Sequence, residues 1–227
     1  MTDTGREALS DLQNHIKKRL TNKTSTIMSK LFFYDLETTG TRYWKNGIHQ
    51  ISGAIMIDGE IKEKFNFKVK PHKDCVIEDE ALAIAGVTRE QIALYPEMSV
   101  VYGKIISMLS KYVDKFKKTD KMYLVGYNNA SFDNQFFRAF FTQNRDNYFG
   151  SWFWADTHDV MVFASNYLRM KRTQMVDFKL KSVAKAVGIE VDEEKLHDAA
   201  YDIDLTMQIY DRVVIKPNEI LKDFDLI

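Results

Sequence analysis

The feature that most restricts how this chain can fold is a short, nearly continuous apolar segment, LFFYDLE, at residues 31–37. A strand this apolar has to be buried on both faces, so the segment predicts a central strand in a sheet that helices cover on both sides. Its acidic residues, Asp35 and Glu37, stand two apart, and alternate side chains of a strand point to the same face. The sequence therefore places two carboxylates together at the end of a buried strand.

Two carboxylates in this position repel each other unless a proton or a cation lies between them. Mg²⁺ and Mn²⁺ prefer oxygen ligands, so a divalent cation is the natural partner for the pair. The plainer alternative is that the two acids only end a strand, since the chain holds 32 acidic residues and an isolated Asp-x-Glu is common. The turn formed by Thr38, Thr39 and Gly40 is expected to offer backbone N–H groups to a ligand.

The remaining segments extend this strand into a layered α/β domain. Segments 51–58 and 61–70 are joined by Asp58-Gly59, a strong signal for a hairpin turn between antiparallel strands. Hydrophobic periodicity predicts further strands at 122–127 and 152–156, and helices at 78–94, 97–117, 131–141, 160–168, 180–188 and 198–214. The expected fold is a five-stranded mixed sheet, with its first three strands antiparallel, flanked by helices.

Residues 1–28 differ from the rest and predict a helical N-terminal extension with a linker, ahead of a domain over 29–227. The 32 basic residues equal the 32 acidic ones, which weakens any role as a passive coat on nucleic acid. A single cysteine suits a reducing cytoplasm, and no apolar run approaches the length that spans a membrane. The expected location is the cytoplasm, with no membrane partner.

Two further segments carry candidate site residues. GYNNASFD (126–133) places Asp133 at the start of a helix, where a helix cap is the plainer interpretation. In HDAAYD, His197 and Asp202 are five apart, so a regular helix would turn them about 140° away from each other. We therefore expect His197 on a loop or first turn, where it could transfer protons, and Asp202 inside the helix. An exposed histidine at a helix start is the alternative.

Taken together, the three segments resemble the DnaQ-like, or DEDDh, 3′→5′ exonuclease family of the RNase H-like superfamily. The motifs are 35–40 (DLETTG), 129–133 (NASFD) and His197 to Asp202, and the resemblance covers roughly residues 30–215. The nearest branches are the nuclease domain of bacterial exonuclease I and the epsilon-type proofreading exonuclease of DNA polymerase III. One departure is Gln50, where many members carry Glu.

The resemblance implies an RNase H-like fold and two divalent cations, Mg²⁺ or Mn²⁺. Asp35 would bridge both cations, Glu37 and Asp202 would complete one site, and Asp133 would help to hold the other. His197 would accept a proton from the attacking water, and the product would be a nucleoside 5′-monophosphate.

The same resemblance assigns substrate-binding residues around the first and second motifs. Thr38 and Thr39 would meet the terminal sugar and phosphate through their backbone, and Asn129 would bind the substrate. Leu36 and Phe132 would wedge against the terminal base, although helical spacing equally allows Phe132 to belong to the core.

The expected function is therefore removal of nucleotides from the 3′ end of single-stranded DNA, with a DNA polymerase or another replication or repair protein as a possible partner. An RNase of the same family is the alternative, and Glu37-Thr38-Thr39-Gly40 favours DNA because oligoribonucleases usually show Glu-Met-Thr-Gly. A catalytically silent nucleic-acid-binding module is disfavoured, since such relatives usually lose a carboxylate and here all four are present.

Overall fold

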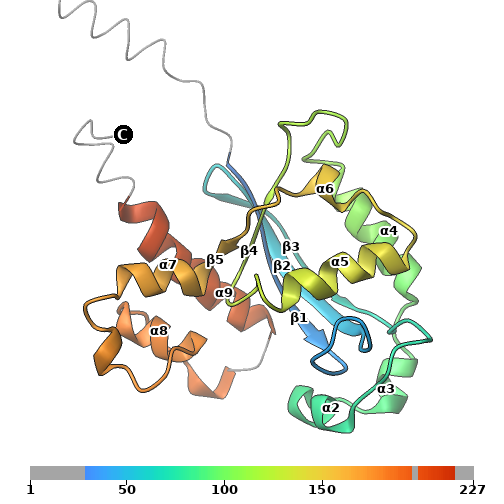
Figure 1. Cartoon of the computed structure of the whole chain (residues 1–227), viewed down its shortest axis with the longest axis horizontal. Coiled ribbons are helices and arrows are strands. Elements are labelled where there is room, and N and C mark those ends of the chain that lie inside the picture. The colour runs from blue at the N-terminus through green and yellow to red at the C-terminus, as the bar shows by residue number, and fades with distance from the viewer. Residues whose placement is uncertain (1–28, 196–198, 218–227) are drawn as a thin grey trace, which may run out of the picture.

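A computed structural model of the chain describes residues 29–195 and 199–217. The predictions for the leader 1–28 and for His197 lie outside the described residues. The described part is built on a five-stranded sheet in the order β3-β2-β1-β4-β5, with helices on both of its faces (Figure 1). The predicted fold class is confirmed.

The first three strands form the predicted antiparallel meander: β1 (Lys30–Thr38), β2 (Ile48–Ile57) and β3 (Glu60–Lys68). The turn between β2 and β3 has positive φ angles at Asp58 and Gly59, as a tight two-residue hairpin turn requires. On the other side of β1, β4 (Tyr123–Gly126) pairs in parallel, and β5 (His158–Asp159) pairs in parallel with β4. The sheet is therefore mixed, and β1 is the strand where its direction changes.

The helices divide between the two faces of the sheet, as Figure 1 shows. One layer contains α4 (Met98–Leu109), α5 (Asp133–Gln143) and α6 (Phe149–Trp152). The opposite layer contains α7 (Val160–Tyr167), α8 (Leu180–Ala186) and α9 (Ala199–Tyr210), which continues into a π-helical turn at Asp211–Ile215. Short 3-10 turns lie at Arg172–Gln174 and Glu193–Lys195. No helix of the described ranges is both long and apolar enough to cross a membrane.

The side chains of β1 point alternately to the two faces of the sheet, which explains why the strand lies between two cores. Phe32 and Leu36 belong to the core under α4, α5 and α6, whereas Leu31 and Phe33 belong to the core under α7, α8 and α9. A fully buried phenylalanine contributes roughly 1.5–3 kcal/mol, so both faces of this strand stabilise the fold. Because side chains alternate, Asp35 lies on the side of the sheet that α9 covers.

The predicted strand at 152–156 is wrong. Phe149–Trp152 forms one helical turn instead, and Phe153 makes only an isolated bridge to Met122. The rings of Phe149 and Phe153 are 4.9 Å apart in the buried core, together with Trp152. Burial of these rings outweighs the strand preference of aromatic residues, and the fifth strand forms further along, at β5.

The helix predicted over 78–94 is two helices, α2 (Asp79–Ala85) and α3 (Arg89–Ala93). Gly86, with a φ of 65°, ends α2 in the left-handed conformation that glycine adopts without strain. Thr88 then starts α3 through a reciprocal capping box with Gln91. A glycine stop followed by a threonine cap divides a segment whose apolar spacing is continuous.

Candidate active site

The candidate site lies at the carboxyl end of β1. Parallel pairing with β4 ends at Phe33↔Val125, so residues 34–38 of β1 extend past the last pair. At this point the neighbour on one side is antiparallel and the neighbour on the other side is parallel. Openings in α/β sheets form where the strand order reverses, at the carboxyl ends of the strands.

Four carboxylates meet at this end of the sheet. Burial is the largest cause that raises the pKa of Asp35 well above its usual range, and the negative charges of Asp133, Glu37 and Asp202 raise it further. Each of the three is therefore close enough to act on Asp35 electrostatically. They come from different elements, since Asp35 and Glu37 lie on β1, Asp133 begins α5, and Asp202 lies in the first turn of α9.

Asp133 has the smallest exposed surface of the four carboxylates. Only 6% of it is exposed, whereas the other three are half-buried. Burial raises its pKa to about 7, against hydrogen bonds from its own backbone N–H and that of Leu36, and the charges of Glu37 and Asp159 add to the rise. At neutral pH this carboxyl group is therefore only about half charged unless a positive charge compensates it.

The donor set fits hard divalent cations, because it consists of carboxylate oxygens. In the described part of the chain, no three His, Cys, Asp or Glu side chains lie in a geometry that would by itself hold a metal ion. Buried carboxylates repel each other, and a cation would offset that repulsion at Asp35 and Asp133. The chemistry of the residues thus suits the cations that the sequence predicts.

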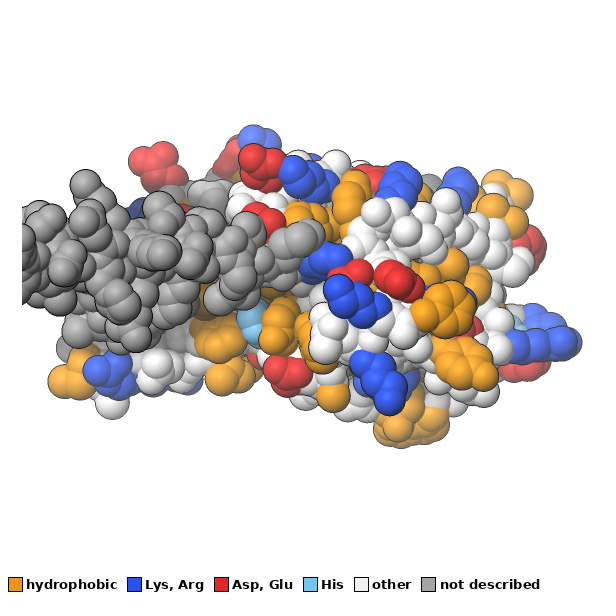
Figure 2. All heavy atoms as spheres, turned by 90° about the horizontal axis from the view of Figure 1, so that it is seen from above, with side chains coloured by type: hydrophobic (Ala, Val, Ile, Leu, Met, Phe, Trp, Pro, Cys, Tyr) orange, Lys and Arg blue, Asp and Glu red, His pale blue; other side chains and the backbone are white. Residues whose placement is uncertain are grey.

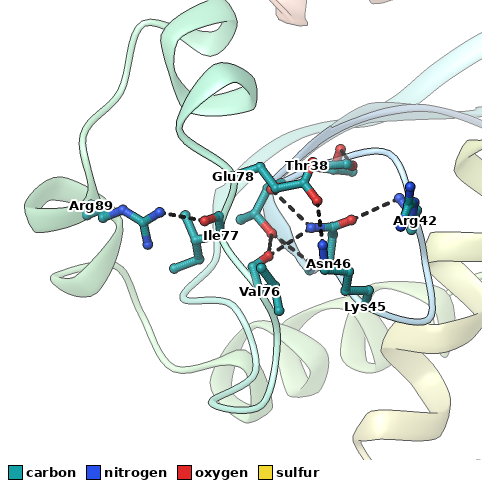
Figure 3. A network of polar contacts seen from close by, with 11 residues as sticks. Thr38, Arg42, Lys45, Asn46, Val76, Ile77, Glu78 and Arg89 are labelled. Atoms are coloured by element: carbon teal, nitrogen blue, oxygen red, sulfur yellow. Dashed lines mark hydrogen bonds and ion pairs between the residues drawn. The ribbon is translucent and has the colours of Figure 1, made fainter.

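The turn after β1 is held by its own hydrogen bonds (Figure 3). Thr39 is fully buried, and its hydroxyl donates to the Val76 carbonyl and accepts from the Gly47 N–H. Its N–H donates to the Gly47 carbonyl at 2.8 Å, so this amide is engaged inside the loop, contrary to the expectation that it is available to a ligand. Thr38 is half-buried, and its hydroxyl donates to the Gly40 carbonyl.

Asn46 is the centre of this network, which Figure 3 shows from close by. Its buried side chain accepts from the Arg42 N–H at 2.9 Å and donates to the carbonyls of Val76 at 2.9 Å and Thr39 at 3.3 Å. Lys45 adds an ion pair with Glu78 at 3.1 Å. The loop 41–46 is therefore fixed to the turn of the first motif and to the segment that precedes α2.

The second motif is held by two residues beyond it, Thr157 and Asp159. Asn129 is fully buried, and its Nδ2 donates to Thr157 Oγ1, which in turn donates to the Leu124 carbonyl. The Asp159 carboxylate accepts from the N–H groups of Asn128 at 3.0 Å and Ala130 at 3.3 Å. These bonds fix the loop that leads into Asp133.

Asp159 was missed as a site residue by the sequence reasoning. It also accepts from the Met161 N–H at 3.0 Å and so caps α7. An aspartate directly before a predicted helix is the signal for such a cap, but its second task, to hold residues 128–130, depends on tertiary structure.

Leu36 and Phe132 both pack into the core beside the site. Leu36 is buried, whereas Phe132 is half-buried with its ring 5.0 Å from that of Phe136. A contact of either residue with a terminal base stays a prediction.

Gln50 lies opposite Glu37 on β2. Its amide donates to Asn66 at 2.9 Å and to Ser52 at 3.2 Å, and Lys68 donates to its carbonyl oxygen. A neutral amide thus lies opposite Glu37, and its oxygen is bound by Lys68.

Comparisons with known proteins match most of the chain. The family model described as an exonuclease, RNase_T, matches residues 32–210. Exodeoxyribonuclease I of Escherichia coli (strain K12) is 30% identical over 196 residues, which cover 79% of this chain and 38% of that protein. The PolC-type DNA polymerase III of Mycoplasmopsis pulmonis is 22% identical over 177 residues, covering 78% of this chain and 11% of that protein. The chain therefore spans less than half the length of either relative.

Solved structures of E. coli exonuclease I share the fold. The complex with a dT13 oligonucleotide has a TM-score of 0.66 at 24% identity, covering 86% of this chain and 43% of that chain. A zinc-bound form in complex with single-stranded DNA has the same TM-score and identity. These likenesses show an RNase H-like arrangement of sheet and helices.

Proposed function

Because the chain belongs to the RNase_T exonuclease family, we propose that it is a metal-dependent 3′→5′ exonuclease acting on single-stranded DNA. It would hydrolyse the terminal phosphodiester bond and release nucleoside 5′-monophosphates. One observation carries the proposal: Asp133, Glu37 and Asp202, from two helices and the central strand, all act electrostatically on Asp35 at the end of β1. Such a group of buried, mutually repelling carboxylates is typical of functional sites.

The proposed roles of the residues follow from their places. Asp35, Glu37, Asp133 and Asp202 would hold two divalent cations, Mg²⁺ or Mn²⁺. When bound, such cations polarise the phosphoryl oxygen and lower the pKa of the attacking water. Asp133 would be fully charged only in their presence, because burial holds its pKa near 7.

The remaining roles concern the proton and the substrate. His197 is proposed to accept the proton of the attacking water. Thr38, Leu36 and Phe132 would contact the terminal nucleotide. Asn129, which is fully buried, would hold the loop before Asp133, and Thr39 would shape the turn that carries Thr38.

Single-stranded DNA as the substrate is supported by the relatives. Two of the E. coli structures that share the fold are complexes with single-stranded DNA or an oligodeoxynucleotide, and the E. coli relative is an exodeoxyribonuclease by name. The PolC-type relative is a DNA polymerase by name, which supports association with a polymerase or another replication or repair protein. A cytoplasmic location is part of the same proposal.

The test is a digestion of matched DNA and RNA strands with Mg²⁺, with Mn²⁺ and with chelator. A 5′-labelled strand should shorten progressively, and a 3′-labelled strand should release its label as a mononucleotide at once. If the protein digests the RNA strand faster than the DNA strand, the proposed substrate is RNA and not DNA.

The Asp35→Asn variant should be inactive with an unchanged circular dichroism spectrum. Asp204→Asn is the matched control, because Asp204 lies two residues from Asp202 on α9 but its side chain is 45% exposed and pairs with Lys64. Full activity of Asp35→Asn, or activity that survives the chelator, would contradict the proposal.

A further inference from the structure

A groove of about 720 Å³ runs beside α5 and reaches Asn134, the residue that follows Asp133. Its lining includes Tyr43 and Trp44 from the loop 41–46, Asn134 and Arg138 from α5, and Thr157. The volume lies within the roughly 300–1,000 Å³ of ordinary ligand sites. The roles proposed above for the terminal nucleotide use none of these residues.

Two aromatic rings stand at the mouth of the groove. The side chain of Trp44 is 72% exposed and that of Tyr43 is 38% exposed, and their rings meet edge to face at 5.1 Å. Exposed large apolar side chains beside a groove mark binding surfaces. The loop that carries them is fixed by the hydrogen bonds of the buried Asn46 (Figure 3), so the rings are presented on a rigid support.

A cation faces the same groove. The Arg138 guanidinium carbon lies 4.5 Å from the centre of the Phe149 ring, which holds the side chain in place. Within the described ranges, no acidic side chain forms an ion pair with Arg138, so its charge is available to a phosphate. Elsewhere basic and acidic side chains are interspersed, as on the face shown in Figure 2, so a strand would be attracted locally and not by the whole surface.

The groove is longer than a single nucleotide. It begins at Asn134, which follows Asp133 and accepts a hydrogen bond from Tyr34, and it continues along α5 to Gln143. The nine helical steps from Asn134 to Gln143 extend about 13 Å, whereas stacked bases of one strand repeat about every 3.4 Å. The groove therefore has room for nucleotides beyond the one that is removed.

We propose that this groove is a stacking site for unpaired bases of the substrate strand next to its terminal nucleotide. Trp44 and Tyr43 would stack on the bases and Arg138 would contact a phosphate. The inference rests on the proposed function. Every base has a face that can stack, so the site would accept any sequence, and it would select single strands because paired bases are already stacked on both sides.

The experiment measures binding of the oligonucleotide dT12 in the presence of chelator, where no strand is cut. Tryptophan emission reports the contact, since Trp44 is exposed whereas Trp152 is buried and Trp154 is half-buried. Trp44→Ala should bind roughly five- to hundredfold more weakly and lose the quenching, because stacking on one aromatic ring contributes that much. Trp44→Phe should retain most of the affinity, measured by anisotropy of labelled dT12.

Abasic substitution identifies the base that stacks. In the wild-type protein, removal of single bases among the second to fourth positions from the 3′ end should weaken binding. At the position that stacks on Trp44, the same removal should have no effect in Trp44→Ala. Phe116→Ala is the matched control, because Phe116 is as exposed as Trp44 but does not line the groove, and this variant should bind like the wild type.

Equal affinity of Trp44→Ala and wild type would overturn the inference, as would an abasic effect confined to the terminal nucleotide. In both cases the wild-type protein would still shorten the strand with Mg²⁺ or Mn²⁺, so the proposed function would stand. A wild-type protein that neither binds dT12 nor shortens it would overturn both.

Discussion

Gly40 lies directly against the side-chain amide of Asn46. A Cβ atom on residue 40 would lie 2.3 Å from Asn46 Nδ2, a distance that real contacts do not reach. The tight turn of the first motif and the amide that fixes the loop 41–46 thus occupy the same space, and glycine is the residue that allows both.

We therefore expect Gly40→Ala to displace Asn46 and to break hydrogen bonds of a buried side chain. The loss should be about 1–3 kcal/mol of unfolding free energy, together with weaker strand binding, because the loop carries Trp44. Gly103→Ala is the control, since nothing lies within 4 Å of its Cβ position in α4, and it should be neutral or slightly stabilising. Chemical denaturation of the two variants checks the difference, and equal effects would refute the steric argument.

Asp35→Asn should make the metal-free protein more stable, although it abolishes activity. The raised pKa of Asp35 means that its charge is unfavourable among buried, like-charged neighbours, and the amide removes that charge. Mn²⁺ should stabilise the wild type, by about 2.7 kcal/mol at a hundred times its dissociation constant, and stabilise the variant much less. Thermal unfolding with chelator and with Mn²⁺ measures both effects. A variant less stable than the wild type in chelator would count against a repelling cluster.

Asp159→Ala should lower both stability and turnover by freeing residues 128–130. Three backbone N–H groups would lose their charged acceptor, a loss of about 3 kcal/mol, and activity should fall roughly 10- to 100-fold as Asp133 loses its position. Asp159→Asn should be milder, since Oδ1 accepts from both Asn128 and Met161 and the amide keeps that oxygen. Denaturation curves and initial rates should rank wild type, Asn and Ala in that order.

His49 should make the protein sensitive to acid. Its ring is buried on β2, neither ring nitrogen has a hydrogen-bond partner among the described residues, and burial lowers its pKa to about 4. The unfolded chain takes up this proton near pH 6.5 and the folded chain only near pH 4, so stability falls as pH drops between these values.

The loss of unfolding free energy that His49 causes is on the order of 3 kcal/mol, and it is complete below pH 4. In His49→Leu the unfolding free energy should vary less with pH between 4 and 6.5. The difference between the two proteins separates the effect of His49 from that of acidic groups that titrate in the same pH range. Denaturant unfolding from pH 4 to pH 7 gives the measurement, and parallel profiles would show that His49 is not responsible.

The hydrophobic pattern of the sequence correctly predicted those elements whose structure is determined by residues close to them in the chain. The apolar run that forms β1 and the spacing of Asp35 and Glu37 sufficed to place two carboxylates at the end of a buried strand. The strand predicted at 152–156 failed because Phe149–Trp152 forms a helical turn that packs its rings into the core, an arrangement that only the surrounding core determines.

The groove could not be predicted for a similar reason. Trp44 lies in a loop without periodicity, and Arg138 belongs to a helix far along the chain. Their meeting depends on how the loop is tied to Val76 through Asn46, a contact between residues 30 apart. Asp159 was recognisable as a helix cap, but its hold on Asn128 arises only when β4 and β5 lie side by side.

The position where β1 and β4 part has a consequence for how such a protein can diversify. The main-chain pairing of β1 with β4 ends at Phe33↔Val125. The separation of the two strands beyond this pair is therefore a property of the backbone and does not depend on which side chains surround it. Loops such as 41–46 can therefore exchange their aromatic residues for others while the four carboxylates keep their places on the scaffold.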